Sequence, residues 1–365
     1  MEPPPMIFLS LTVLLIYLGF VLWLWRGVKS AAAFQPDTTP REFTPFSVII
    51  AAHNEEETIG ETLNRFLNQQ YPPEKFEIVV VADRCRDGTV GIVRELIRKH
   101  ANISLKSIEE VPEGISPKKN ALVKGIGKAR FDRLVFMDAD CLPGPLYLAT
   151  LNRYFQSGAE VVVNIPKVRV EKNLLHSYLL PERLVTWSIA AAGVGHRSPF
   201  LAFGGSWAYR RDLLERSGGF AEISHLLSGD DDLLIYRMGK LNPQMAVCFE
   251  PEGWVTTGLP GSVKSFFRQR RRHHSAGKYY AGKVKIGYAV FHAANLLLWV
   301  LPLFFLPATI PLLAKILADA LVLFYSARLF RERISFVNLL FFEIGYLLHN
   351  LIIAPLGFVG RVRWK

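Results

Sequence analysis

The chain has 365 residues, of which half are hydrophobic and 21% are charged. This length accommodates one large domain with additions, or two modest domains. The composition is too apolar for a purely soluble protein and too charged for a chain that lies in a membrane throughout. The sequence therefore predicts a protein with both a water-exposed part and a membrane part.

The formal net charge is +11, and the basic residues gather beside apolar segments. A basic surface attracts nucleic acid, anionic lipid or a phosphate-bearing substrate. The sequence has no recognition helix, zinc spacing or RNA-binding signature, so nucleic acid is not an expected partner. Clusters beside membrane segments favour a lipid surface and a cytoplasmic flank. These clusters are Arg26 with Lys29, Arg268–Arg272, Arg328–Arg333 and Arg361–Lys365.

The three cysteines are Cys85, Cys141 and Cys248. Their number is odd and they lack CxxC or Cys/His spacing, which argues against a disulfide framework or a zinc site. This usage is compatible with a reducing compartment.

Met6–Trp25 is an uncharged apolar stretch, long enough as a helix to cross the roughly 30 Å hydrocarbon layer of a bilayer. A cleaved signal peptide is the alternative. Such peptides carry positive charge before the apolar run, whereas Arg26 and Lys29 follow it here. The sequence therefore predicts a transmembrane anchor at residues 1–26, with everything after it in the cytosol.

Apolar character returns near the C-terminus, over residues 284–365. Ile286–Leu306 and Pro307–Phe324 are predicted as two spans joined at a proline-rich break. Phe336–Val359 is a third apolar segment, but it contains Glu343 and precedes a basic tail. It either spans, re-enters or lies in the interface. We therefore expect a multi-pass membrane protein with two or three C-terminal apolar helices.

The middle of the chain alternates short apolar runs with helical patterns, which predicts βαβ units and a mainly parallel sheet. We expect an α/β catalytic domain at residues 46–283, after a linker at residues 27–45. The predicted strands are Phe46–Ala51, Phe76–Ala82, Ile103–Ile108 and Arg133–Asp138.

Ligands of such sheets bind beyond the carboxyl ends of the strands, and polar residues occupy those ends here. Asp138 and Asp140 point the same way if the chain is extended. Two carboxylates on one side can hold Mg²⁺ or Mn²⁺, whose other positions take phosphate oxygens. An isolated Asp-x-Asp also occurs in surface loops and caps, but the buried strand before it favours a metal site. The other polar residues at strand ends are His53, Asn54, Glu55 and Asp83.

Gly229–Leu234 contains three adjacent aspartates. A helix N-terminus, where the dipole favours negative charge, is the ordinary reason for such a cluster. That position also presents a carboxylate from a rigid element, so the cluster offers a candidate general base.

Ser265–Tyr280 pairs basic residues with aromatic ones. One interpretation is an interfacial helix that binds anionic headgroups. The other is that Gln269 and Arg272 reach a leaving diphosphate or the acceptor, because guanidinium groups suit phosphate oxygens.

Seven segments, taken in order, resemble the family 2 glycosyltransferases. The resemblance implies a GT-A fold, which is Rossmann-like with flanking helices, together with a nucleotide-sugar donor, a divalent metal and usually inversion at the anomeric carbon. The segments are Val48–Glu57, Val80–Thr89, Lys118–Leu122, Asp138–Asp140, Gly204–Arg211, Gly229–Leu234 and Gln269–His273.

The resemblance also implies roles for single residues. Ala51, His53 and Glu55 match the family's nucleotide-contacting first loop, although Pro-x-Tyr is frequent there. Asp83 matches the acidic residue that recognises the base. Lys118 matches the lysine of a Gly-Lys-Ala-like segment.

Asp138 and Asp140 match the family's Asp-x-Asp, with Asp140 the expected direct metal ligand. Gln269 and Arg272 match a Gln-x-x-Arg-Trp motif, in which His273 replaces the tryptophan of the acceptor platform.

The catalytic base has two candidates. When Arg237 is aligned with the arginine of the family's motif, Asp231 aligns with the catalytic base of the family and Asp230 aligns with the glutamate before it. A shift of one residue makes Asp230 the base. We favour Asp231.

We therefore expect an inverting glycosyltransferase that uses Mg²⁺ or Mn²⁺. It would move a hexosyl or N-acetylhexosaminyl group from a nucleotide-sugar, preferably a UDP-sugar, to a lipid or lipid-linked acceptor at the cytoplasmic membrane face. The alternatives are a processive polysaccharide synthase, a nucleotidyltransferase on the same fold and an inactive membrane adaptor. A conduit for a polymer would need more membrane segments, and Ala51–Glu57 lacks the glycine-rich loop of a nucleotidyltransferase.

Overall fold

The computed structural model describes residues 5–37, 42–169, 174–258 and 262–356. The chain divides into two compact units. The sheet unit comprises residues 32–169 and 197–261, and the helical unit comprises residues 1–31, 170–196 and 262–362.

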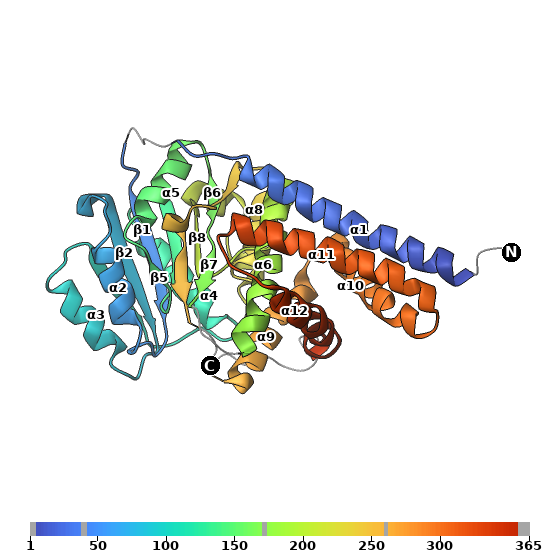
Figure 1. Ribbon diagram of the computed structural model, residues 1–365. Coiled ribbons are helices and arrows are strands. Elements are labelled where there is room, and N and C mark those ends of the chain that lie inside the picture. The colour runs from blue at the N-terminus through green and yellow to red at the C-terminus, as the bar shows by residue number, and fades with distance from the viewer. Residues whose placement is uncertain (1–4, 38–41, 170–173, 259–261, 357–365) are drawn as a thin grey trace. The chain divides into compact units, whose positions relative to one another are not determined.

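A seven-stranded sheet is the framework of the sheet unit (Figure 1). Its strand order is β3-β2-β1-β4-β8-β6-β9. The first four strands are mutually parallel, whereas β8 runs antiparallel to both of its neighbours. This mainly parallel sheet confirms the predicted α/β class. The strands are β1 (Phe46–Ala52), β2 (Phe76–Asp83), β3 (Ile103–Ile108), β4 (Arg133–Asp138), β6 (Val161–Val163), β8 (Ser206–Arg210) and β9 (Met245–Val247).

Parallel pairing aligns the carboxyl ends of the central strands. Ala51 of β1 lies opposite Val81 of β2 on one side and opposite Asp138 of β4 on the other. The loops that follow these strands therefore emerge at one edge of the sheet, where ligands of parallel sheets bind.

Helices and a small second sheet complete this unit. α2 (Ile59–Leu67) buries Ile59, Leu63 and Phe66, whose helical spacing gives it one apolar face. The second sheet has the order β5-β10-β7. The remaining named elements are α3 (Thr89–Ile97), α4 (Pro117–Lys128), α5 (Tyr147–Gln156), α7 (Arg211–Arg216), α8 (Asp232–Gly239), β5 (Leu142–Pro143), β7 (Pro166–Val168) and β10 (Val255–Thr257).

Within the described residues, the helical unit holds four segments long and apolar enough to cross a membrane. The segment at residues 336–353, which the sequence left open, meets this criterion together with the other three. The segments are Pro5–Ala32, Gly282–Leu303, Leu306–Leu329 and Phe336–Ile353. They contain the helices α1 (Pro5–Ala32), α10 (Gly282–Val300), α11 (Thr309–Leu329) and α12 (Phe336–Leu348).

Two further helices belong to the helical unit, α6 (Leu174–Gly195) and α9 (Val263–Ala276). No helix was predicted at residues 174–195, so only the structure groups α6 with the membrane-length helices. The predicted domain boundaries at residues 26, 45 and 283 stay predictions.

The charge of Glu343 is compensated inside the helical unit. Its side chain forms an ion pair with Lys315 of α11, and both residues are buried. Lys315 also pairs with Asp319 at 2.9 Å, and the Tyr17 hydroxyl of α1 donates to Asp319 at 2.8 Å. Buried charges among apolar helices are costly unless they are paired. The cluster therefore lets α12 carry a carboxylate and joins it to α11 and α1, which Figure 1 shows running alongside α11.

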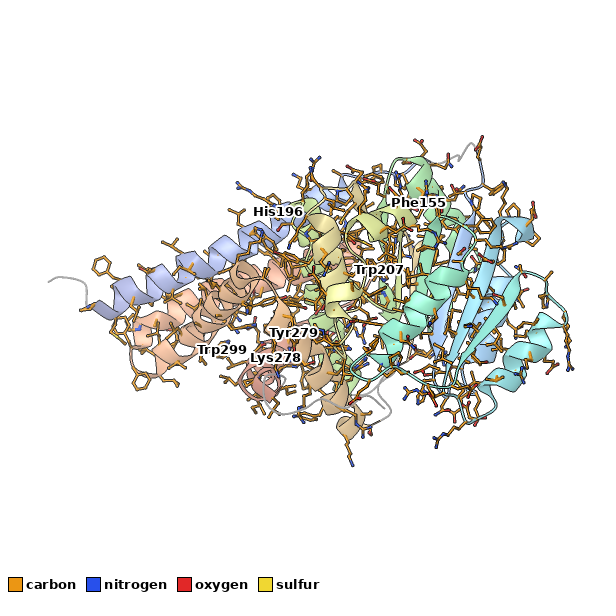
Figure 2. The ribbon with its side chains drawn as sticks, turned by 180° about the vertical axis from the view of Figure 1, so that it is seen from behind. Phe155, His196, Trp207, Lys278, Tyr279 and Trp299 are labelled. Atoms are coloured by element: carbon orange, nitrogen blue, oxygen red, sulfur yellow. The ribbon has the colours of Figure 1, made fainter. Side chains whose placement is uncertain are left out.

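α1 and α6 approach each other at two glycines. A Cβ atom added at Gly195 would lie 1.9 Å from the carbonyl oxygen of Gly27. Beside this crossing, the His196 ring stacks on Trp23 and its Nε2 hydrogen-bonds the Trp23 carbonyl at 2.8 Å; Figure 2 labels His196 against α1. The close approach of the two backbones therefore requires glycine at position 195.

We expect Gly195→Ala to separate α1 from α6, because the added methyl group overlaps backbone atoms that cannot rotate away. Overpacking of this kind costs about 1–3 kcal/mol, which should lower the melting temperature of the detergent-solubilised protein by several degrees. Gly287→Ala in α10 is the matched control, since a Cβ there meets nothing within 4 Å. Equal melting temperatures for the two variants would contradict the crossing.

Candidate active site

The loops after β1 and β2 are joined by hydrogen bonds. His53 Nδ1 lies 2.6 Å from the carbonyl oxygen of Asp83. The Glu55 backbone N–H donates to the Thr89 hydroxyl at 2.8 Å. The structure therefore brings together three residues that the sequence assigned to donor binding, namely His53, Glu55 and Asp83.

The Asp83 carboxylate is engaged by its neighbour. Arg84 donates through Nε to one carboxylate oxygen at 2.9 Å and through Nη2 to the other at 3.0 Å. Asp83 is 4% exposed, whereas the Arg84 side chain is 38% exposed. A nucleobase bound beside Asp83 would therefore meet the Asp83–Arg84 ion pair, rather than an isolated carboxylate.

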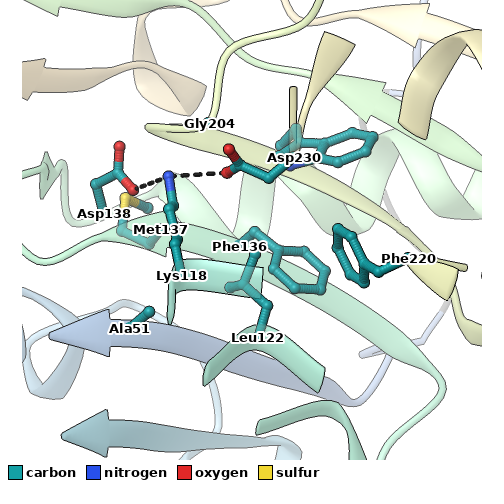
Figure 3. Close-up of a pocket in the computed structure, with 10 residues that line it drawn as sticks. Ala51, Lys118, Leu122, Phe136, Met137, Asp138, Gly204, Phe220 and Asp230 are labelled. Carbon is teal, nitrogen blue, oxygen red and sulfur yellow. Dashed lines mark ion pairs between the residues drawn. The ribbon is translucent and has the colours of Figure 1, made fainter. Parts of the chain in front are cut away.

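Lys118 lies between two carboxylates that come from distant parts of the sequence. Its Nζ is 2.9 Å from an Asp138 oxygen and 2.9 Å from an Asp230 oxygen (Figure 3). Pro117 starts α4 at a position that suits proline, which places Lys118 in the first turn. Burial by itself lowers the pKa of Lys118, but the two carboxylates outweigh it and raise that pKa well above its ordinary value. The ammonium charge is therefore retained at neutral pH.

These three charged groups line a pocket at the carboxyl edge of the sheet (Figure 3). Ala51 near the end of β1 lines it as well, and the predicted contact of Ala51 with a donor stays a prediction. The other walls are mostly apolar, and charges act more strongly in such surroundings than in water. They are formed by Leu122, Phe136, Met137, Gly204, Trp207 and Phe220.

Asp231 occupies the N-terminus of α8. Its side chain accepts the Asp232 N–H at 2.8 Å and the Gly204 N–H at 2.7 Å. Burial, followed by repulsion from Asp230, raises the pKa of Asp231 to about 6. A carboxylate that titrates near neutral pH is suited to act as a general base. Asp230, by contrast, faces the pocket through its pair with Lys118.

Asp138 and Asp140 are the two carboxylates that could hold a metal ion. Ligand atoms of Asp138, Asp140 and Cys141 all lie within 4.8 Å of one another, and Asp140 is exposed. Burial raises the pKa of Cys141 well above its ordinary value, so its sulfur stays a thiol, which is a poor ligand for a hard cation. The two carboxylates by themselves fit Mg²⁺ or Mn²⁺.

Gln269 and Arg272 lie on α9 of the helical unit. α9 begins at a capping box formed by Ser262 and Ser265, and Arg270 donates to Glu182 of α6 at 2.6 Å. Contact of Gln269 and Arg272 with a donor stays a prediction.

Sequence reasoning passed over Lys119. Its Nζ donates to the carbonyl oxygens of Leu226 and Ser228, the latter at 2.8 Å, and the residue is 1% exposed. The two lysines are adjacent in the sequence and only Lys118 matches the motif. The helical position of Lys119 was the available signal for its burial. That position shows a role only once the segment that packs against it is known.

The mixed sheet with its carboxylate-lined edge defines a GT-A-type transferase fold. The model of the family described as Glycosyltransferase like family 2 matches residues 42–276, which is more than half of the chain. The chain therefore belongs to this glycosyltransferase family.

Curated relatives carry related names. The probable glycosyltransferase YdaM of Bacillus subtilis (strain 168) is 27% identical over 284 residues, which cover 74% of this chain and 66% of that protein. The poly-beta-1,6-N-acetyl-D-glucosamine synthase of Staphylococcus aureus (strain COL) is 27% identical over 153 residues, 41% of this chain and 35% of that protein. The chain thus spans less than two thirds of the length of these relatives.

A solved structure has a similar fold. It is the mannosyltransferase PcManGT from Pyrobaculum calidifontis in complex with GDP-Man and Mn²⁺, with a TM-score of 0.58 and 22% identity. The similarity covers 94% of this chain and 98% of that one. At this identity it supports the fold alone, and it confirms the GT-A architecture expected from the sequence.

The raised pKa of Asp231 predicts a dependence of stability on pH. A carboxyl group whose pKa is raised by folding stabilises the protein below its ordinary pKa of 3.8, and that contribution is lost as the pH rises through about 6. Asp231→Asn carries no charge at any pH, so it should become more stable relative to the wild type between pH 5 and pH 8. We expect a difference on the order of 1 kcal/mol, because partial exposure and one lost acceptor reduce the effect.

The measurement is the melting temperature of both proteins at pH 5 and pH 8. A difference between variant and wild type that does not change with pH would contradict the raised pKa.

Proposed function

We propose that this protein is a metal-dependent, inverting glycosyltransferase that moves a sugar from a nucleotide-sugar to an acceptor at a membrane surface. One observation carries the proposal, namely the pocket in which Lys118 lies between Asp138 and Asp230. Membership in a glycosyltransferase family supports sugar transfer over a nucleotidyltransferase reaction. Burying charged groups is costly, and an inactive adaptor would have no need for the charged groups that line this pocket.

The donor side of the site would consist of Lys118, Asp138 and Asp140. A divalent cation bound by the two aspartates would neutralise charge on the departing nucleoside diphosphate. The Lys118 ammonium offers a second positive charge beside them, fixed by its two ion pairs before the donor arrives. Charge that is placed in advance stabilises a developing anion without reorganisation.

The acceptor side would depend on Asp231. Its carboxylate, held at the start of α8, would accept the proton of an acceptor hydroxyl as the oxygen attacks the anomeric carbon. Attack from the face opposite the leaving diphosphate inverts that carbon. Asp230 remains the second candidate, because it lines the pocket and Asp231 does not.

The acceptor is proposed to be a lipid or a lipid-linked molecule at the cytoplasmic face of a membrane. Four segments of the described residues are long and apolar enough to span one, and basic residues cluster beside several of them. Local similarity to a poly-N-acetylglucosamine synthase keeps polymer synthesis as the second candidate. The length of the product distinguishes the two.

A donor panel tests the proposal. The full chain, in lipid nanodiscs with a bacterial lipid extract and Mn²⁺ or Mg²⁺, is incubated with UDP- and GDP-linked sugars. We expect release of one nucleoside diphosphate and transfer of label to the lipid fraction. GDP-sugars are included because the solved structure with a similar fold is a complex with GDP-Man. Absence of nucleotide release with every donor would refute the proposed function.

The base assignment predicts different behaviour for two adjacent variants. Asp231→Asn should lower kcat by about 10²–10⁴-fold while donor binding is retained, because general-base catalysis contributes that much. Asp230→Asn should weaken donor binding, because Lys118 loses one of its two partners. In the wild type, kcat should rise with pH through about 6 as Asp231 ionises.

The measurements are kcat and KM between pH 5 and pH 8, with donor affinity by calorimetry. A near-normal kcat for Asp231→Asn beside an inactive Asp230→Asn would make Asp230 the base.

The metal assignment predicts that EDTA stops transfer and that Mn²⁺ restores it. Asp140→Asn should raise the Mn²⁺ concentration for half-maximal donor binding roughly tenfold or more, since an amide is a weaker ligand than a carboxylate. Asp132→Asn is the matched control, because Asp132 is an exposed carboxylate just before β4, whereas Asp140 lies just after it. Equal Mn²⁺ requirements for the two variants would remove Asp140 from the metal site.

A further inference from the structure

One end of α4 holds the backbone of the segment before the acidic cluster. The Ser116 N–H donates to the Ser224 carbonyl at 2.7 Å. Lys119 Nζ donates to the carbonyl oxygens of Leu226 and Ser228. Three hydrogen bonds, one from the N-cap residue of α4 and two from its first turn, therefore hold residues 224–228.

Lys119 makes these contacts from a buried position. A buried ammonium is costly unless it is hydrogen-bonded, and here two carbonyl oxygens accept hydrogen bonds from it. Burial lowers the pKa of Lys119 to about 8, against the opposing influence of the Asp230 and Asp231 carboxylates. A methionine of similar length would fill the space without burying a charge. The lysine therefore adds hydrogen bonds to the segment, rather than apolar packing.

The segment held in this way leads directly into the acidic cluster. Gly229, with a φ of +81°, turns the chain between Ser228 and Asp230 in a conformation that favours glycine. Asp230 then contacts Lys118, and Asp231 begins α8. A displaced Ser228 would therefore displace both carboxylates.

We propose that Lys119 is a positioning residue that sets the placement of Asp230 and Asp231 for sugar transfer. The inference rests on the proposed function. Lys118 points from α4 into the pocket, and Lys119 points to the backbone behind it. One turn of α4 would therefore place both the positive charge that faces the donor and the carboxylate that acts as the base. A displacement of about 1 Å from reacting geometry can cost 100-fold in rate, which is the effect expected if this support is lost.

The test uses the full chain in nanodiscs, with the donor and acceptor that the panel identifies. Lys119→Met should lower kcat roughly 10- to 100-fold. The Mn²⁺ requirement should change by less than about threefold, because Asp138 and Asp140 are intact. The donor KM should rise as it does in Asp230→Asn, because a displaced Asp230 no longer pairs with Lys118. Lys124→Met, at an exposed position of the same helix, is the matched control and should behave as the wild type.

A double-mutant cycle separates positioning from general damage. If Lys119 acts through the base, Lys119→Met should lower the residual rate of Asp231→Asn by less than about threefold, since no base remains to be placed. Should the aspartate comparison identify Asp230, Asp230→Asn becomes the background. An equal loss in both backgrounds, or an unchanged kcat for Lys119→Met alone, would overturn the inference.

If Lys119→Met does not fold, as judged by its melting curve and gel filtration, the cycle is run with Lys119→Arg. Arginine keeps the charge but replaces a compact ammonium by a longer, planar guanidinium, so we expect it to displace the segment. An equal loss of rate in both backgrounds, or an unchanged kcat for Lys119→Arg alone, would again overturn the inference. A wild type that releases no nucleotide at all would count against the proposed function instead.

Discussion

An ammonium group shared by two carboxylates is the interaction on which this site depends. Lys118 of α4 contacts Asp138 at the end of β4 and Asp230 before α8. Without it, two acidic groups would face one pocket and repel each other. The lysine thus compensates the charge on both sides of the pocket. It also fixes the distance between the carboxylates assigned to the metal and those assigned to the base.

The sheet supplies the frame for this interaction. Parallel pairing brings the ends of β1 and β4 together, with Ala51 opposite Asp138. β8 is antiparallel to β4 and pairs Ser206 with Met137, so the residues before β8 arrive at the same edge. Gly204, in that segment, donates its N–H to Asp231. A reversal of strand direction in the middle of the sheet therefore brings the acidic cluster to the carboxyl ends of the parallel strands.

The helical unit follows the same rule for buried charge. Lys315 is paired with Asp319 and Glu343, and Tyr17 donates to Asp319. In both units a lysine between two carboxylates joins elements that are distant in the sequence. In the helical unit the cluster joins membrane-length helices, whereas in the sheet unit it lines a pocket and leaves carboxylates for chemistry.

The sequence by itself determined the parallel strands β1 to β4, the apolar segments and the position of Asp138 and Asp140 at the end of a buried strand, because periodicity, hydropathy and short motifs are local properties. It could not decide that Lys119 holds the backbone before the acidic cluster, that Arg84 engages Asp83, or that Lys315 compensates Glu343. Each of these depends on groups from separate elements, and so only the tertiary structure decided them. The spacing of residues along a chain fixes which face of an element a side chain takes, but not what that face meets.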